Sequence, residues 1–281
     1  MSERVALLGG SGFIGTALAT ALRARGDEVS LLSLRAPRAA AAAASACGVI
    51  VNLAGEPIAQ RWTPKIKRRI LDSRTRAPRD FLEALAALPR TSRAYVSASA
   101  IGYYGSDPDA TFDETSLSGN DFLARVCLGW EREAQGAEAL GMRTACVRTG
   151  LLLGHGGALA KMLPLFALGL GGRYGDGRQW YSWIHIDDAI ALYLLAIDGL
   201  RGAVNATAPH PVRNADFAAT LARALRRPAF LAVPAFALRL ALGEGAQVIL
   251  GGQRVLPKRA EELGFRFKFP ELLGALKPLV V

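Results

Sequence analysis

Blocks of apolar residues separated by glycines and polar residues divide the first half of the chain into alternating strands and helices. Arg4 to Leu8 is a short apolar run that ends in glycines, and from Ile14 onward apolar residues recur at helical spacing. The same alternation continues through further strands at Glu28–Leu34, 48–53, Arg93–Ser97 and Met142–Arg148. Strands that alternate with helices of ten or more residues are typical of a doubly wound parallel sheet, so an α/β fold of the Rossmann type is predicted.

One interval of this pattern is too short for a full strand–helix repeat. About a dozen residues separate the second strand from the strand near Val49, and an alanine run, Ala39 to Ala44, fills most of them. Alanine favours helix, and the interval leaves no room for another strand. In the usual strand order 3-2-1-4-5-6 the third strand is an outer edge. We therefore expect a sheet that lacks its third strand, with one short helix crossing directly to the fourth.

After Arg148 the pattern changes to glycine-rich connections around a helix near 158–168, and then to mostly helical sequence. We assign 1–205 to the Rossmann domain, with 155–180 contributing to a substrate cleft, and 206–281 to a small, mostly helical C-terminal domain. Ser182 to Ile186 is expected to be a strand, with Asp187 or Asp188 capping the helix that follows.

The glycines at positions 9, 12 and 15 carry the strongest chemical signal. They follow the first strand and open a helix, and this context distinguishes a dinucleotide site from an ordinary turn. A tight turn without side chains lets backbone N–H groups approach a pyrophosphate, and the helix N-terminus adds partial positive charge. Gly9, Gly12, Phe13, Ile14 and Gly15 are therefore predicted to bind the cofactor.

The end of the second strand selects between NAD and NADP. NAD enzymes usually place a carboxylate there to bind the ribose 2′-hydroxyl, whereas this chain has Leu32-Ser33-Leu34-Arg35. Arg35 and Ser33, helped by Arg38, are expected to bind a 2′-phosphate, since a guanidinium fits phosphate geometry. The predicted cofactor is NADP(H).

The composition of the chain excludes several kinds of binding site and partner. The chain has 281 residues, a formal net charge of +10 and three cysteines far apart, with no CxxC motif. No metal site, disulfide framework, transmembrane span or secretory segment is predicted, and a cytoplasmic protein is expected. The positive residues are spread in small groups, so we expect solvated helix faces that attract anionic small molecules and no nucleic-acid binding.

Several long strings resemble one family. GGSGFIG, VNLAGEPIAQRWT, KIKRRILDSR, SASAIGYYG, VCLGWEREA, GGALAKMLPLFALGLGG and SWIHIDDA resemble the epimerase family that includes bacterial YfcH, an atypical branch of the extended short-chain dehydrogenases/reductases. LGEGAQVILGGQRVLP and ELGFRF look like the small helical domain that ends such proteins. The resemblance covers nearly the whole chain, and the alanine interval is shorter than the family pattern.

The resemblance implies a place for the nicotinamide beyond the NLAG strand. It implies that Leu53, Ala54, Gly55 and Glu56 line the cofactor. By the same likeness the strand containing Ser97 ends beside the nicotinamide, and Arg148 closes the site from the next strand.

The catalytic residues of such families are not all present. Extended relatives use a serine and a Tyr-xxx-Lys pair on one helix, but Leu and Cys stand at the matching positions on the helix from Phe122, and no YxxxK occurs in the chain. Ser99, Tyr103 and Tyr104 are the candidate catalytic residues, with the alternative that both aromatic rings only line the pocket.

The sequence alone leaves the roles of other residues near the expected cleft open. Glu131 is expected to pair with Arg125 or Arg132. Cys127 and His185 fit core positions better than catalytic ones. Lys161, Arg178 and Gln179 are weaker candidates for binding an anionic substrate.

Two functions remain open from the sequence. One is an NADP(H)-dependent oxidoreductase or epimerase with a non-standard acid, acting as a monomer or homodimer on a small polar or anionic substrate, with nucleotide-sugar-like compounds as one candidate class. The other is a protein that senses NADP(H) without turnover.

Overall fold

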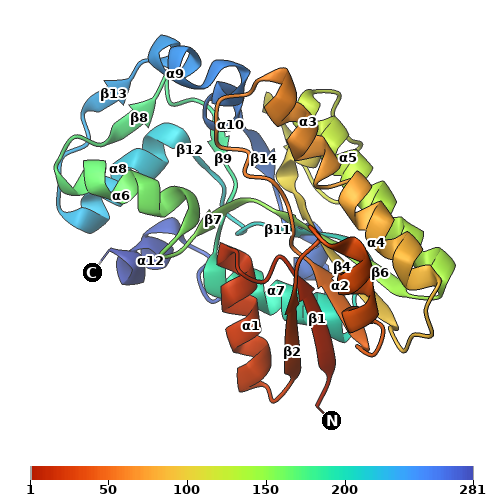
Figure 1. Cartoon of the computed structure of the whole chain (residues 1–281). Helices are drawn as coiled ribbons and strands as arrows, with labels where there is room; N and C mark the ends of the chain where they lie inside the picture. The colour runs from red at the N-terminus through yellow and green to blue at the C-terminus, as the bar shows by residue number, and fades with distance from the viewer. Residues whose placement is uncertain (1, 281) are drawn as a thin grey trace.

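The computed structural model describes residues 2–280 and has a six-stranded, all-parallel sheet at its centre (Figure 1). From edge to edge the strands are β2 (Glu28–Leu32), β1 (Arg4–Leu8), β3 (Val49–Asn52), β4 (Ala94–Ala100), β6 (Arg143–Thr149) and β11 (Gly202–Ala206). The predicted α/β fold is confirmed.

The expectation of a missing third strand is also confirmed. β2 is an edge strand, and the short helix α2 (Pro37–Ala44) leads from it to β3 on the other side of β1. Ala40, Ala41 and Ala44 of the alanine run are buried against the sheet. Because alanine side chains are small, this helix packs closely in the space available to a single crossing.

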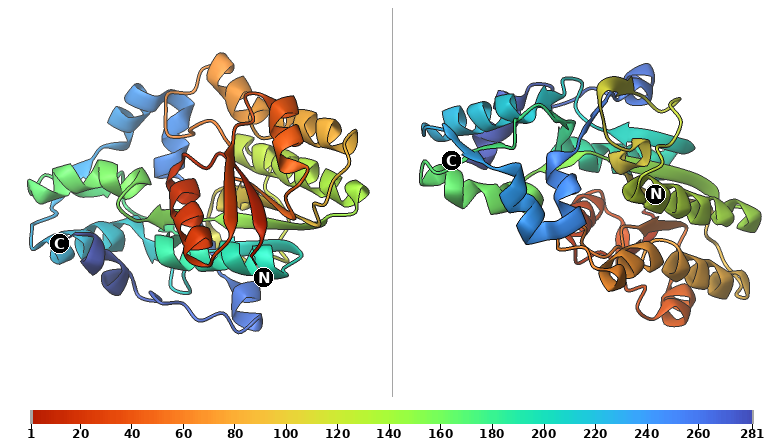
Figure 2. Two further views of the ribbon diagram at one scale, coloured as in Figure 1. Left: turned by 60° about the horizontal axis from the view of Figure 1, so that its bottom comes forward. Right: turned by 90° about the horizontal axis from the view of Figure 1, so that it is seen from above.

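Helices cover both faces of the sheet (Figures 1 and 2). On one face, α1 (Phe13–Ala24) and α7 (Ile186–Asp198) pack on alternate residues of the strands, such as Val5 and Leu7 of β1. On the other face, α2 and α4 (Arg76–Ala86) pack on the intervening residues, such as Ala6 and Leu8, and α5 (Phe122–Gln135) packs on β4 and β6. α3 (Pro64–Asp72) precedes α4 and contacts α5.

A smaller layer of short elements stands beside the end of the sheet where β1 runs into the glycine turn. Its helices are α6 (Gly157–Ala167), α8 (Asn214–Leu225), α9 (Ala235–Leu242), α10 (Gln247–Leu250) and α12 (Leu272–Leu276), whereas α11 (Lys258–Glu262) packs on β11 at the edge of the sheet. Four two-stranded pairs connect distant segments: β7 (Leu151–Leu153) with β10 (Trp183–His185), β8 (Gly172–Tyr174) with β13 (Leu231–Val233), β9 (Trp180–Tyr181) with β12 (Val212–Arg213), and β5 (Asp107–Phe112) with β14 (Gln253–Val255). Four 3₁₀ turns complete the described chain: η1 (Ile101–Tyr104), η2 (Gly136–Leu140), η3 (Gly243–Ala246) and η4 (Lys277–Leu279).

The cap of α7 differs from the expectation. His185 caps the helix, because its Nδ1 accepts a hydrogen bond from the backbone N–H of Asp187 at 3.1 Å. Asp187 and Asp188 lie in the first turn, and the Asp188 carboxylate accepts hydrogen bonds from the backbone N–H groups of Lys268 and Phe269. The prediction of an aspartate cap was therefore wrong, since Asp188 binds the returning C-terminal segment.

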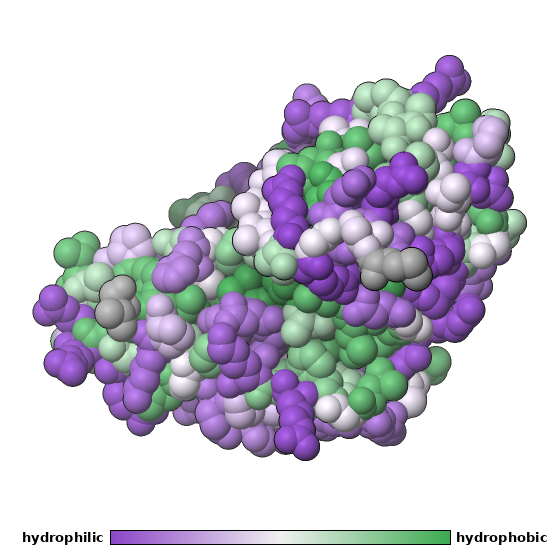
Figure 3. All heavy atoms as spheres, turned by 90° about the horizontal axis from the view of Figure 1, so that it is seen from below, coloured by the Kyte–Doolittle hydropathy of each residue, from purple (hydrophilic) through white to green (hydrophobic). Residues whose placement is uncertain are grey.

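Hydrophobic and hydrophilic residues are interspersed over the face of the molecule drawn in Figure 3. None of the helices within residues 2–280 is long and apolar enough to cross a membrane.

Candidate functional site

The glycine turn between β1 and α1 forms a cradle that side chains would fill. Gly9 has a φ of +78°, and a Cβ there would lie 2.8 Å from the backbone N of Ala54. A Cβ on Gly15 would lie 2.7 Å from backbone atoms of Gly10. Gly12 is the N-cap residue of α1, and no side chain caps that helix. The turn therefore presents helix N–H groups at a surface of bare backbone, which fits a pyrophosphate.

Two other residues of the turn have packing roles. Ile14 packs partly buried against the core under α1. Phe13 lies against a second glycine-rich segment, because a Cβ on Gly154 or Gly156 would come within 2.7 Å of its ring. Phe13 thus joins the glycine turn to the loop that leads into α6.

Exposed cations follow the second strand. Arg35 and Arg38 are exposed, and neither takes part in an ion pair among the described residues. The Ser33 hydroxyl accepts the backbone N–H of Arg35 at 3.3 Å, which orders this short loop. A guanidinium free of carboxylate partners fits a 2′-phosphate.

The segment after β3 runs close beside the glycine turn. The backbone N–H of Leu53 bonds to the carbonyl of Leu8, and Ala54 lies against Gly9. Leu53 and Ala54 are half-buried, and Gly55 is exposed. The Glu56 carboxylate accepts a hydrogen bond from Arg69 at 3.0 Å. The contact of these four residues with the cofactor stays a prediction.

A buried network of one ion pair and its hydrogen bonds lies at the carboxyl ends of β4 and β6. Arg148 makes two hydrogen bonds of 2.8 Å to the Glu131 carboxylate of α5, and the Ser99 hydroxyl donates to the same carboxylate at 2.7 Å. Ser99 and Arg148 are neighbours in register on adjacent strands, so their side chains share a face. Burial opposes the charge of Arg148, but the hydrogen bonds and negative charge of Glu131 raise its pKa.

Tyr104 extends this network on its other side. Arg148 donates to the Tyr104 hydroxyl at 2.9 Å, and that hydroxyl donates to Asn205 at 2.7 Å. Burial raises the pKa of Tyr104 to about 12, although Arg148 acts in the opposite direction. Tyr103 lies over Arg148, with the guanidinium carbon 3.5 Å from the ring centroid. It lines a cavity of about 230 Å³ between α5 and the β6–β11 edge.

The hydrogen bonds of this network limit the roles of two candidate catalytic residues. The hydroxyls of Ser99 and Tyr104 are both bonded within the protein, an arrangement that favours a structural role for them. Ser97 is fully buried, with its hydroxyl bonded to the carbonyl of Ala98. The expectation that Glu131 pairs with Arg125 or Arg132 was wrong, because α5 lies over β4 and β6 and turns Glu131 toward Arg148. The catalytic roles of Ser99, Tyr103 and Tyr104 stay predictions.

The residues on α5 that replace the Tyr-xxx-Lys pair are apolar or neutral. Leu123 and Cys127 both lie near Gly102, since a Cβ on that glycine would be 3.4 Å and 3.7 Å from them. Burial raises the pKa of Cys127 to about 12, so it is a neutral thiol at physiological pH. His185 is buried against Phe269, as expected for a core histidine.

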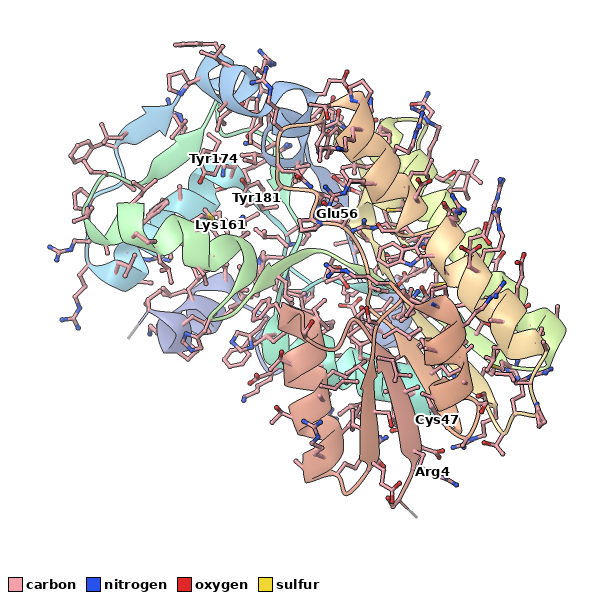
Figure 4. All side chains as sticks on the ribbon, viewed as in Figure 1. Arg4, Cys47, Glu56, Lys161, Tyr174 and Tyr181 are labelled. Atoms are coloured by element: carbon pink, nitrogen blue, oxygen red, sulfur yellow. The ribbon has the colours of Figure 1, made fainter. Side chains whose placement is uncertain are left out.

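The smaller layer contributes polar and aromatic side chains. Figure 4 labels Lys161 of α6, Tyr174 of β8 and Tyr181 of β9 together with Glu56, and the ring of Tyr181 packs edge-on against Phe217, with 5.4 Å between the ring centroids. Lys161 is exposed, and burial raises the pKa of both tyrosines. Gln179 is held by its side-chain N–H bonds to the carbonyls of Tyr174 and Ile249, and Arg178 is exposed.

Sequence reasoning missed Arg74, which comes just after α3. Its Nη1 donates to the carbonyls of Glu56 and Ile70, and its guanidinium lies against Gly55. The available signal was a cation at the end of KIKRRILDSR, but neighbouring cations in that string lie on the surface.

Comparison with known protein families shows to which family the chain belongs. The NAD-dependent epimerase/dehydratase family matches residues 5–207, and a domain of unknown function, DUF1731, matches residues 233–279. The chain belongs to this epimerase/dehydratase family. The glycine turn and the parallel sheet lie within the part of the chain that matches this family.

Individual relatives agree along almost the whole chain. The SDR39U1 homolog of Arabidopsis thaliana is 40% identical, covering 98% of this chain and 86% of its own. Epimerase family protein YfhF of Bacillus subtilis is 39% identical, covering 98% and 97%. The crystal structure of human epimerase family protein SDR39U1 with NADPH has a TM-score of 0.91 and 35% identity, and the match covers 99% of each chain. The family resemblance is confirmed, and the expected NADP(H) agrees with the NADPH in that human structure.

Proposed function

We propose that this protein binds NADP(H) and reduces or epimerises a small polar substrate. The observation that carries the proposal is the pairing of the bare glycine turn at α1 with the unpaired cations Arg35 and Arg38 beyond β2. The turn fits a pyrophosphate and the cations fit a 2′-phosphate, which NAD lacks. The NADPH-bound human relative supports the same cofactor.

Three segments of the chain would each bind a different part of the cofactor. The turn at Gly9 to Gly15 would hold the pyrophosphate, Arg35 and Ser33 the 2′-phosphate, and the segment Leu53 to Glu56 would lie along the nicotinamide half. Bound NADPH would supply a hydride. The network of Glu131 and Arg148 would fix the ends of β4 and β6, so that the strands keep their positions around the cleft.

The substrate would lie between the sheet and the smaller layer. Lys161 is exposed and offers positive charge, and Tyr174 is a partly buried tyrosine of the same layer. Such a set suits a small anionic or polar compound, with nucleotide sugars as one candidate class. Because Ser99 and Tyr104 are bonded elsewhere, a proton would come from Tyr103, from a substrate-side tyrosine or from water.

A second function, sensing NADP(H) without turnover, is favoured by one observation. Two of the three candidate hydroxyls, those of Ser99 and Tyr104, are engaged in the buried network. A protein that only responds to the nucleotide needs no free acid.

One experiment separates the two functions. The protein is incubated with NADPH deuterated at the transferable position and with the small-molecule fraction of a cell extract, and products are examined by mass spectrometry. Deuterium in a product that is absent with Gly9→Asp supports an oxidoreductase. NADPH binding without any transfer of deuterium contradicts an oxidoreductase. An epimerase returns the hydride to its substrate, so it is tested by the same incubation with NADP⁺ and by the appearance of a second stereoisomer, and the absence of both products favours the sensor.

A further inference from the structure

Arg74 carries a positive charge that no carboxylate of the described chain neutralises. Its Nη1 donates to the carbonyl oxygens of Glu56 at 3.0 Å and Ile70 at 3.3 Å, and to the Ser73 hydroxyl at 3.3 Å. No ion pair within residues 2–280 includes Arg74, and the carboxylate of Glu56 is bonded to Arg69 instead. Burial lowers the pKa of Arg74, although a guanidinium stays protonated at neutral pH. A cation in this setting gains from an additional polar partner.

Two donors of Arg74 are left without a partner. Nε and Nη2 have no hydrogen-bond partner within residues 2–280, and they are not among the buried unpaired atoms, so they keep access to solvent. Nη2 would be 2.8 Å from a Cβ on Gly55, which is an exposed residue. Gly55 directly follows Ala54, whose backbone touches the Gly9 turn. The guanidinium therefore lies one residue along the chain from the backbone that touches the glycine turn.

The same guanidinium lies next to the part of α5 that lacks the family's lysine. Its central carbon is 4.8 Å from the ring centroid of Trp130, which is three residues after Cys127 on the helix. A Cβ on Gly129 would lie 2.9 Å from the Thr75 side chain, so only a glycine lets the segment carrying Arg74 approach α5 this closely. Cys127 itself is neutral and has no charge to offer.

We propose that Arg74 supplies, from the junction of α3 and α4, the positive charge that a lysine on α5 supplies in relatives with a YxxxK pair. Its Nε and Nη2 groups bind oxygen atoms of the nicotinamide half of NADPH and hold that half against Gly55. This inference rests on the proposed NADP(H) binding. Arg74 is a positioning residue, and it keeps its proton throughout.

Binding measurements with a whole and a half cofactor test the role directly. Wild type, Arg74→Gln and Arg74→Lys are titrated with NADPH and with adenosine 2′,5′-bisphosphate, which contains only the adenine half. Arg74→Gln is expected to weaken NADPH binding by about tenfold or more, since it removes charge-assisted hydrogen bonds. Affinity for the bisphosphate stays at the wild-type value, and Arg74→Lys recovers part of the lost NADPH affinity.

Arg76→Gln is the matched control, because Arg76 is an exposed cation two residues away that pairs only with Asp80. It is expected to bind both ligands as wild type does. Unchanged NADPH affinity in Arg74→Gln overturns the inference. Equal loss of both ligands, together with a lower melting temperature, also overturns it, because Arg74 would then act through folding. If wild type binds neither ligand, the proposed function itself falls.

Discussion

At the scale of single residues, the pair of Glu131 and Arg148 makes the sharpest stability prediction. Both side chains are buried, so Glu131→Gln leaves the guanidinium without its countercharge. The free energy of unfolding is expected to fall by about 3 kcal/mol, measured by urea denaturation. Glu133→Gln is the control on the same helix, because its partner Arg79 is 55% exposed, and a much smaller loss than in Glu131→Gln is expected. Equal losses in the two variants would contradict a buried structural pair.

His185 gives a pH-dependent prediction. Burial lowers its pKa, although Asp187 and Asp188 raise it and Lys268 and His155 lower it further. The unfolded chain then binds a proton more readily below the usual histidine pKa of about 6.5, so stability present above that pH is lost as the pH falls. The melting temperature of wild type should drop more between about pH 7.5 and about pH 5.5 than that of His185→Asn, which keeps a capping acceptor. The same drop in both would rule out His185 as the source.

The sequence predicted those residues of the candidate site that a local pattern defines, and it did not predict those that depend on contacts between distant segments. The glycine turn and Arg35 are local features, since one strand, one turn and one helix define them. The partners of Glu131 and the inward position of Arg74 depend on how α5 lies over the sheet and on the space left by Gly55 and Gly129. Such contacts join segments far apart in the chain, so local patterns could not reveal them.

At the scale of elements, the turn between β1 and α1 is expected to tolerate no side chain at Gly9. Gly9→Ala combines a φ of +78° with a contact of 2.8 Å to the backbone of Ala54. We expect it to lower both stability and NADPH affinity, measured by denaturation and by nicotinamide fluorescence. Gly26→Ala is the control, because Gly26 has a φ of +91° but open space around it. It should lose about 1 kcal/mol of stability and keep its NADPH affinity; a Gly9→Ala variant that behaves the same way would contradict a cofactor role for the turn.

The order of the main elements followed from the sequence, including the absent edge strand. The alanine interval was informative because its length excluded a strand–helix pair, whatever its detailed conformation. Among the two- and three-residue strands of the smaller layer, β10 was predicted, as the strand expected at Ser182 to Ile186, and the others were not. Each exists only through pairing with a remote segment, as β8 does with β13, and so leaves no periodic pattern of its own.

At the scale of the whole molecule, the smaller layer is joined to the sheet domain by contacts between Gln60–Trp62 and the turn at 243–246. Lys67 pairs with Glu244, and Arg61 donates to the carbonyl of Leu240. A Cβ on Gly245 would lie 2.4 Å from the carbonyl oxygen of Gln60, so Gly245→Ala should force these segments apart. We expect faster backbone deuterium exchange in 240–246 and a loss of about 1–3 kcal/mol.

Gly274→Ala provides the comparison for that variant. Gly274 lies in α12 with nothing near its Cβ position, so alanine there should leave exchange in 240–246 unchanged. Unchanged exchange in Gly245→Ala as well would show that these contacts do not hold the two parts together.

The most direct test of the whole account is a titration of the purified protein with NADPH and, separately, NADH, followed by nicotinamide fluorescence. Because Arg35 and Arg38 have no carboxylate partners, NADPH is expected to bind at least about tenfold more tightly than NADH. Arg35→Ala should remove most of that difference and leave NADH binding unchanged. Equal affinity for the two nucleotides in wild type would contradict the assignment of the 2′-phosphate to Arg35, and the absence of binding to either would contradict the cofactor site itself.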